Sequence, residues 1–167
     1  MNESQNPAGR KSAGAPSGPG TSAPRQILVV EDDHCIRQIN TEVLLNAGYL
    51  VDQAEDGAVA WDILQLKGYD LLLTDNEMPV LSGLELLKRL HAARLDLPVI
   101  MATGTLPKDE FTRYPWLKPA GTLIKPYTLD ELLIAVREVL SVTDAAPGQN
   151  APQAQWQIQP PAGGLRL

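Results

Sequence analysis

Short apolar runs alternate with segments of helical periodicity through the middle of this chain. The run at 27–30 is continuous and apolar, which is typical of a strand buried on both faces. Apolar residues then recur at helical spacing from 36 to 47, and Gly48 follows as a stop signal. The same alternation predicts further strands at 50–54, 71–73, 98–102 and 123–124, and further helices over 58–64, 84–90 and 132–140.

Capping residues mark where several of these helices begin. Asp33 is predicted to be an N-cap or first-turn acid, and Ser82 is a plausible N-cap for the third helix. Thr128 and Glu131 have the spacing of a capping box ahead of the last helix. The segment between the last two strands contains three prolines, each of which would remove a helix hydrogen bond at a cost of about 3 kcal/mol. We therefore expect the fourth helix to be short and irregular.

Strands that are apolar throughout and alternate with helices predict an α/β fold, with a parallel sheet covered by helices on both faces. Glycine and proline concentrate in residues 1–25 and 144–167, and such segments bury too little apolar surface to offset the entropy of ordering them. We therefore expect one folded domain at 26–143 between two disordered tails.

The composition excludes several functional classes. The chain carries 14 Lys+Arg against 20 Asp+Glu, a net charge of −6, which argues against nucleic acid as a partner. No apolar run approaches the length of a membrane span, and residues 1–24 lack the apolar stretch of a secretory signal. A cytoplasmic protein with no membrane partner is expected. The single cysteine, Cys35, excludes an internal disulfide and is expected to be a small core residue.

Polar residues follow the predicted strands at the points where those strands end. Glu31 and Asp32 follow the first strand, Asp75 the third, Thr103 the fourth and Lys125 the fifth. Because parallel topology brings these strand ends to one edge of the sheet, we expect the five side chains to converge on a small cleft.

Converging carboxylates need a cation. Two like charges 4 Å apart repel by about 4 kcal/mol at an effective dielectric of 20, and Mg²⁺ with its oxygen ligands would relieve this. Lys125 would pair with Asp75 or hold a phosphoryl oxygen, and the Thr103 hydroxyl would donate to another oxygen. Phosphoryl transfer needs mainly positioning and charge neutralisation, so Asp75 is the predicted nucleophile and would form an aspartyl phosphate.

Four stretches in this order and spacing resemble the receiver domain of two-component response regulators. They are Leu28-Val29-Val30-Glu31-Asp32, Thr74-Asp75-Asn76-Glu77-Met78-Pro79 with Gly83, Val99-Ile100-Met101-Ala102-Thr103-Gly104, and Lys125-Pro126-Tyr127. The resemblance implies a flavodoxin-like, doubly wound, five-stranded parallel sheet in the order 2-1-3-4-5.

The resemblance also implies roles by position. Asp75 matches the phosphoacceptor, Thr103 the switch hydroxyl, and Lys125 the family's lysine, with a cis peptide before Pro126. The metal ligands would be Asp32 directly, Glu31 through water, Asp75, and the backbone carbonyl of Glu77. The cofactor would be Mg²⁺. The phosphoryl donor would be a phosphohistidine on a sensor histidine kinase or a histidine phosphotransfer protein.

Two features depart from the family pattern. Thr122 stands three positions before Lys125, where the family often has an aromatic switch residue, and prolines interrupt the fourth helix. Both features argue against the family's usual coupling and dimerisation through the face that this helix shares with the fifth strand and the last helix. We also predict that Glu77 and Thr105, which flank the path of attacking water, tune the lifetime of the aspartyl phosphate.

These observations predict a single-domain response regulator. It would be a signalling protein that catalyses only its own phosphorylation and dephosphorylation, and it would signal to an unknown downstream protein by contact or phosphotransfer. One alternative is a pseudo-receiver, an interaction module that does not phosphorylate. A second is a hydrolase of the haloacid-dehalogenase type, although that chemistry requires a second aspartate as acid/base two residues after the nucleophile, where this chain has Glu77.

Overall fold

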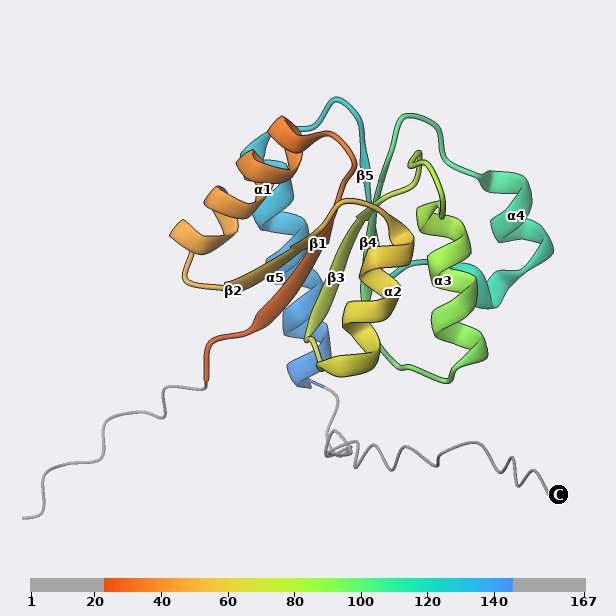
Figure 1. Cartoon of the computed structure of the whole chain (residues 1–167), viewed down its shortest axis with the longest axis horizontal. Coiled ribbons are helices and arrows are strands. Elements are labelled where there is room, and N and C mark those ends of the chain that lie inside the picture. Colours follow the sequence, from red (N-terminus) through yellow and green to blue (C-terminus); the bar gives the residue numbers. More distant parts are fainter. Residues whose placement is uncertain (1–22, 146–167) are drawn as a thin grey trace, which may run out of the picture.

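The computed structural model describes residues 23–145 and contains one five-stranded sheet, all of whose strands are parallel (Figure 1). The strand order is β2-β1-β3-β4-β5, as the resemblance implies. The strands are β1 (Gln26–Val30), β2 (Leu50–Ala54), β3 (Leu71–Asp75), β4 (Val99–Thr103) and β5 (Gly121–Ile124).

Helices cover both faces of the sheet. On one face lie α1 (His34–Asn46) and α5 (Leu129–Ala145), and on the other lie α2 (Gly57–Leu66) and α3 (Gly83–Ala92). No helix within residues 23–145 combines the length and apolar character needed to cross a membrane.

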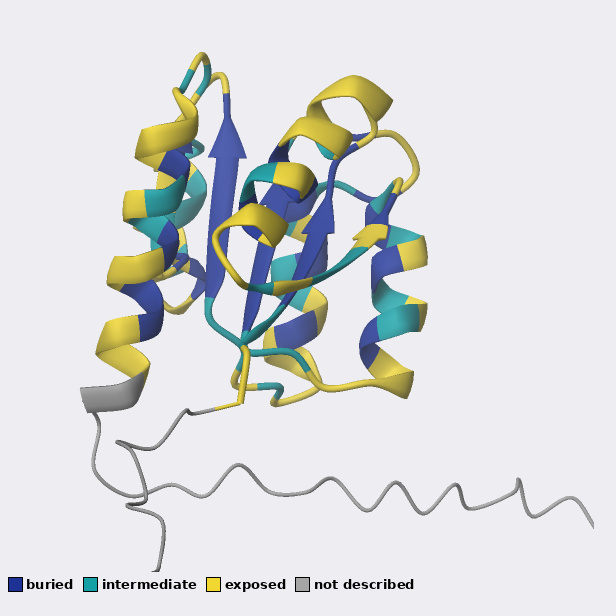
Figure 2. Ribbon diagram, turned by 90° about the vertical axis from the view of Figure 1, so that its left-hand side faces the viewer, coloured by how far each residue is buried: buried dark blue, intermediate teal, exposed yellow. Residues whose placement is uncertain are grey.

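The two faces explain why the first strand is apolar from Ile27 to Val30. Ile27 and Val29 pack into the core beneath α1 and α5, whereas Leu28 and Val30 pack into the core beneath α2 and α3. Successive side chains of a strand point to opposite faces, so a doubly covered sheet needs apolar residues at both. Figure 2 shows the result: the central strands are buried, and exposed residues lie on β2 and β5, in loops and on the outer surfaces of the helices.

The fourth helix is short, as the prolines predict. α4 (Lys108–Arg113) has six residues and no side-chain cap, and a 3₁₀ turn, η1 (Pro115–Leu117), follows it. The ring of Trp116 stacks on that of His91 in α3, with centroids 4.1 Å apart. Lys88 of α3 also pairs with Glu110 of α4 at 3.2 Å. These contacts hold the irregular segment against α3.

The structure corrects two predictions from the pattern. Cys35 is exposed, because it lies in the first turn of α1, beside the loop at the carboxyl end of β1. Ile36 and Ile39 are also exposed, and the helix instead buries Asn40 and Thr41 with Leu44. Helical spacing gives the period of an amphipathic helix, but tertiary contacts set its rotation.

The last helix, α5, ends at Ala145, two residues beyond the predicted domain boundary at 143. The two predicted tails, 1–25 and 144–167, lie outside the described residues except for 23–25 and 144–145.

Candidate functional site

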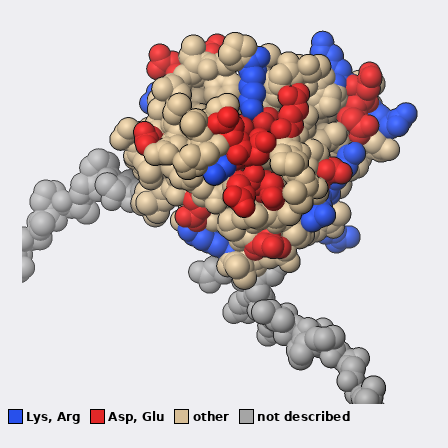
Figure 3. All heavy atoms as spheres, turned by 45° about the horizontal axis from the view of Figure 1, so that its top comes forward, with Lys and Arg blue, Asp and Glu red and all other residues tan. Residues whose placement is uncertain are grey.

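The loops that follow four of the strands meet at one edge of the sheet. Figure 3 shows Asp and Glu side chains gathered over this edge, with a few basic side chains among them. The ligand atoms of Glu31, Asp32 and Asp75 all lie within 4.8 Å of one another. The structure therefore confirms that the predicted carboxylates converge.

Asp75 is the last residue of β3 and is only 4% exposed. One of its carboxylate oxygens lies 2.8 Å from Nζ of Lys125, and the other accepts a hydrogen bond from the backbone N–H of Glu77 at 3.2 Å. The carbonyl of Asn76 accepts from the N–H of Gly83, and the Asn76 side chain accepts from the N–H of Leu84. These bonds tie the loop after β3 to the start of α3.

Glu31 is buried, and its carboxylate accepts from Nζ of Lys125 at 3.1 Å. Burial, and then the negative charge of Asp75, raises the pKa of Glu31 above its usual value. Asp32, the next residue, is exposed. Asp33 caps α1 by accepting from the N–H groups of Cys35 and Ile36, as the sequence predicts.

Lys125 joins the two buried carboxylates. Burial works to lower the pKa of Lys125, but its hydrogen bonds with Asp75 and Glu31 outweigh burial and raise that pKa. The backbone N–H of Lys125 donates to the carbonyl of Thr103, which fixes the end of β5 against β4. The peptide bond between Lys125 and Pro126 is cis, in agreement with the resemblance.

The Thr103 hydroxyl is buried, and its hydrogen bonds are to the backbone of its own loop. It donates to the carbonyl of Thr105 at 2.7 Å and accepts from the Thr105 N–H at 3.3 Å. Glu77 is exposed, and its carboxylate lies over Gly104, where an added Cβ would be 3.5 and 3.7 Å from its oxygens. Glu77 and Thr105 thus both flank the predicted phosphoacceptor and switch hydroxyl.

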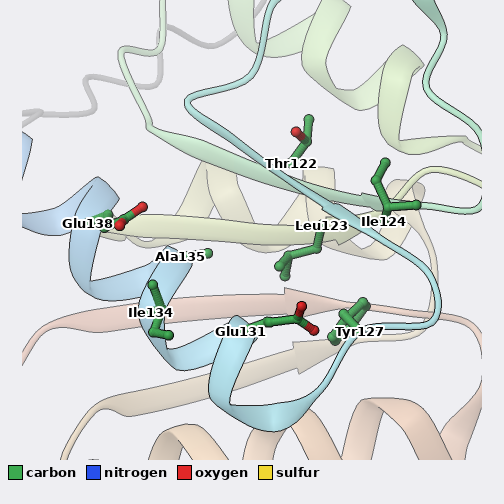
Figure 4. A pocket seen from close by; sticks show the side chains of 8 residues that line it. All are labelled: Thr122, Leu123, Ile124, Tyr127, Glu131, Ile134, Ala135 and Glu138. Carbon is green, nitrogen blue, oxygen red and sulfur yellow. The ribbon is translucent and has the colours of Figure 1, made fainter.

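Thr122 lies away from the acidic edge. It is exposed on β5 and lines a groove of about 380 Å³ between β5 and α5 (Figure 4). Tyr127, Glu131 and Ile134 line the same groove. The position where the family often carries an aromatic switch residue therefore holds a small hydroxyl side chain that faces solvent.

Sequence reasoning missed two groups beside the site. Arg37 donates to the backbone carbonyls of Glu31 and Asp32, and Asn40 donates to the hydroxyl of Tyr127. The Asp33 cap was a signal for Arg37, because it places Arg37 one helical turn from the acidic loop. No comparable signal marked Asn40, since its burial depends on the rotation of α1.

Comparison with known proteins decides the family. The family model of the response regulator receiver domain matches residues 27–137, more than half of the chain. The chain belongs to the response regulator receiver family. This receiver is 34% identical over 132 residues to the response regulator MprA of Mycobacterium sp. (strain KMS), covering 77% of the chain and 56% of the relative. It is 36% identical over 121 residues to MprA of Mycobacterium avium (strain 104), covering 71% and 52%.

The receiver therefore spans little more than half the length of these curated relatives. Solved structures agree on the fold. The receiver domain of the Francisella response regulator 1452 matches with a TM-score of 0.66 and 28% identity over 71% of this chain and 98% of that one. The response regulator protein TrrA of Thermotoga maritima, in complex with Mg²⁺ and BeF, matches with a TM-score of 0.61 and 31% identity over 69% and 98%.

Proposed function

We propose that this receiver accepts a phosphoryl group from a phosphohistidine onto Asp75 in a Mg²⁺-dependent phosphorelay. The observation that carries the proposal is the position of Lys125, whose Nζ lies 2.8 Å from Asp75 and 3.1 Å from Glu31. A buried nucleophile thus lies against a fixed cation and within 4.8 Å of two further carboxylates. This arrangement suits phosphoryl transfer, in which positioning and charge neutralisation supply most of the catalysis.

In the proposed reaction, a carboxylate oxygen of Asp75 attacks the phosphorus of the phosphohistidine. The new P–O bond forms as the P–N bond breaks, and the imidazole of the donor leaves with that electron pair. Lys125 would hold a negative oxygen of the phosphoryl group. The Thr103 hydroxyl would reach another oxygen after exchanging its bond to the Thr105 carbonyl, which couples phosphorylation to the loop after β4.

The donor set fits Mg²⁺, because three carboxylates supply the hard oxygen ligands that this ion prefers. Glu31, Asp32 and Asp75 would hold the ion, and the backbone carbonyl of Glu77 would be a further ligand. When bound, Mg²⁺ would neutralise negative charge on the phosphoryl oxygens. The Mg²⁺ named with the similar protein TrrA supports this part of the proposal.

The proposed donor is a sensor histidine kinase or a histidine phosphotransfer protein in the cytoplasm. We further propose that the receiver turns over no separate substrate and signals to a downstream protein by contact or onward phosphotransfer. The net charge of −6 supports protein rather than nucleic acid as the partner.

The test is intact-protein mass spectrometry after incubation with phosphoramidate and Mg²⁺. We expect one phosphoryl adduct that is lost with EDTA and in Asp75→Asn, and kept in the matched control Asp62→Asn, an exposed aspartate of α2. A folded protein that gains no adduct with Mg²⁺ present would overturn the proposal. The pseudo-receiver would then be favoured, in line with the Thr103 hydroxyl bonded to its own loop and Thr122 facing solvent.

A further inference from the structure

Arg37 reaches back from the first turn of α1 to the acidic loop at the end of β1. Its Nη1 donates to the carbonyl oxygen of Glu31 and, at 3.3 Å, to that of Asp32. Its Nη2 lies 3.3 Å from Nδ1 of the His34 ring. One guanidinium therefore holds two consecutive peptide groups, both belonging to predicted metal ligands.

Holding these carbonyls has a consequence for the carboxylates. The direction of a carbonyl fixes the backbone torsion of its own residue, and hence the direction in which the Cα–Cβ bond leaves the chain. The Glu31 N–H is held as well, because it donates to the carbonyl of Ala54 at 3.2 Å. With N–H and carbonyl both fixed, the Glu31 side chain is aimed at Lys125, with which it pairs at 3.1 Å.

The contacts of Arg37 do not indicate a role in ion pairing or in core packing. Among the ion pairs of residues 23–145, none joins Arg37 to a carboxylate, although acidic residues surround it in the sequence. Its side chain also lines an open hollow of about 270 Å³, rather than a packed core, and the other lining residues are Gln53, Ala54, Glu55 and Val59. Truncating Arg37 would therefore leave little buried space to collapse, and its charge-assisted bonds to the two carbonyls are what would be lost.

We propose that Arg37 is a positioning residue for the Mg²⁺ site. It holds the backbone of Glu31 and Asp32 so that their carboxylates face Asp75 before metal and phosphoryl donor arrive. The inference rests on the proposed function, because it concerns the same site. Arginine suits the task better than lysine, since the rigid, planar guanidinium fixes the directions in which Nη1 donates to the two carbonyls.

The test compares Arg37→Met, Arg37→Lys and the control Gln38→Ala with the wild type. Gln38 is the neighbouring residue of α1, and its side chain bonds Glu42 rather than the loop. The first measurement is the dissociation constant for Mg²⁺ by calorimetry. The second is the hydrogen-exchange rate of the Asp33 N–H in the absence of metal, because this N–H donates to the Glu31 carboxylate at 3.4 Å. Circular dichroism establishes that each variant is folded at the temperature used.

In Arg37→Met we expect the dissociation constant to rise roughly tenfold or more, as for other groups that orient metal ligands. The Asp33 N–H should exchange faster. Arg37→Lys should also bind Mg²⁺ more weakly than wild type, whereas Gln38→Ala should match it.

An Arg37→Met protein with wild-type affinity would overturn the inference and leave the proposed function standing. Wild-type affinity in Arg37→Lys would overturn it too, because charge alone would then suffice. A wild type that binds no Mg²⁺ would instead overturn the proposed function, and the inference with it.

Discussion

The side-chain amide of Asn40 donates a hydrogen bond to the hydroxyl of Tyr127 across 3.0 Å. This bond joins α1 to the loop after β5, two residues beyond Lys125. Asn40 is only 3% exposed, and the burial of Tyr127 raises its pKa even though the bond from Asn40 acts to lower it. The bond therefore connects the helix after the acidic loop to the loop after Lys125, and it satisfies a buried amide.

Removing the Tyr127 hydroxyl should cost stability through Asn40. In Tyr127→Phe the buried amide loses its partner, and we expect the free energy of unfolding to fall by about 1–3 kcal/mol. The double variant Asn40→Leu with Tyr127→Phe should recover much of this loss, since neither polar group is then left unpaired. Urea unfolding of the singles and the double gives the coupling energy directly.

Tyr49→Phe is the matched control, because Tyr49 is partly buried and its hydroxyl bonds to no residue within 23–145. It should unfold like the wild type. If the double variant loses the summed cost of the two singles, the two side chains are not coupled, and the structure is wrong at this contact.

Val80 is strained by its backbone. Its φ of 66° lies in the left-handed region, which is unfavourable for a β-branched residue, yet its side chain is 80% exposed. Val80→Asn should raise the free energy of unfolding by about 1 kcal/mol, because asparagine tolerates this conformation. Val142→Asn, at an exposed valine within α5, should give no gain. Equal effects at both positions would mean that exposure, and not backbone strain, determines the result.

The positions of the strands could be predicted because each central strand contains a continuous apolar run of three or four residues. Helix starts at Asp33, Ser82 and Thr128 were also predictable, since a cap depends on residues at most three apart, and all three make capping bonds. The meeting of Asp75, Glu31 and Lys125 followed from parallel topology alone, which brings the strand ends to one edge.

What could not be predicted depends on tertiary contacts. The apolar positions of α1 suggested a buried face that includes Ile36 and Ile39, but the helix is rotated so that Asn40 reaches Tyr127. The Thr103 hydroxyl was expected to face the phosphoryl group, and its orientation toward Thr105 is set by the shape of one loop. The positive φ of Val80 had no signal, because glycine or asparagine usually marks such a position.

Gly83 lies so close to Asp75 that no side chain fits. A Cβ at this position would be 2.3 Å from the backbone oxygen of Asp75, so the loop after β3 would have to move. Gly83→Ala should lower the free energy of unfolding by about 1–3 kcal/mol and slow phosphorylation, since the moved loop directly follows the nucleophile. Gly68→Ala is the control, because nothing lies within 4 Å of its Cβ, and it should be neutral or stabilising. Thermal melts and adduct formation test both; equal behaviour of the two alanines would contradict the close approach.

Glu31 should make metal-free stability depend on pH. Burial, then Asp75, raises the pKa of Glu31 in the folded state, so folding favours its protonated form. The stabilisation from this group is fully present below its usual pKa of 4.5 and is lost as the pH rises through the raised folded value. At neutral pH the ionised side chain therefore costs stability, and Glu31→Gln should melt at a higher temperature than the wild type without metal.

Mg²⁺ should reverse that order. A ligand at 100 times its dissociation constant stabilises the folded state by about 2.7 kcal/mol, and Glu31→Gln would lose part of this gain. Melting curves at several pH values, with EDTA or with Mg²⁺, measure both effects, and Glu138→Gln on α5 controls for general surface charge. A less stable Glu31→Gln in EDTA at neutral pH would show that the bond to Lys125 outweighs the cost of burial.

Glu77 and Thr105 should set how long the aspartyl phosphate survives. The Glu77 carboxylate lies over Gly104, and the Thr105 carbonyl accepts the Thr103 hydroxyl, so both flank the approach of water to Asp75. The carboxylate is an acceptor that would orient an attacking water. Losing one such hydrogen bond, worth about 1 kcal/mol, should slow hydrolysis about fivefold in Glu77→Ala with Thr105→Ala. The decay of the phosphoryl adduct after removal of the donor measures the rate, with Glu138→Ala as a distant control. A double variant that hydrolyses at the wild-type rate would show that water reaches the phosphoryl group without help from either residue.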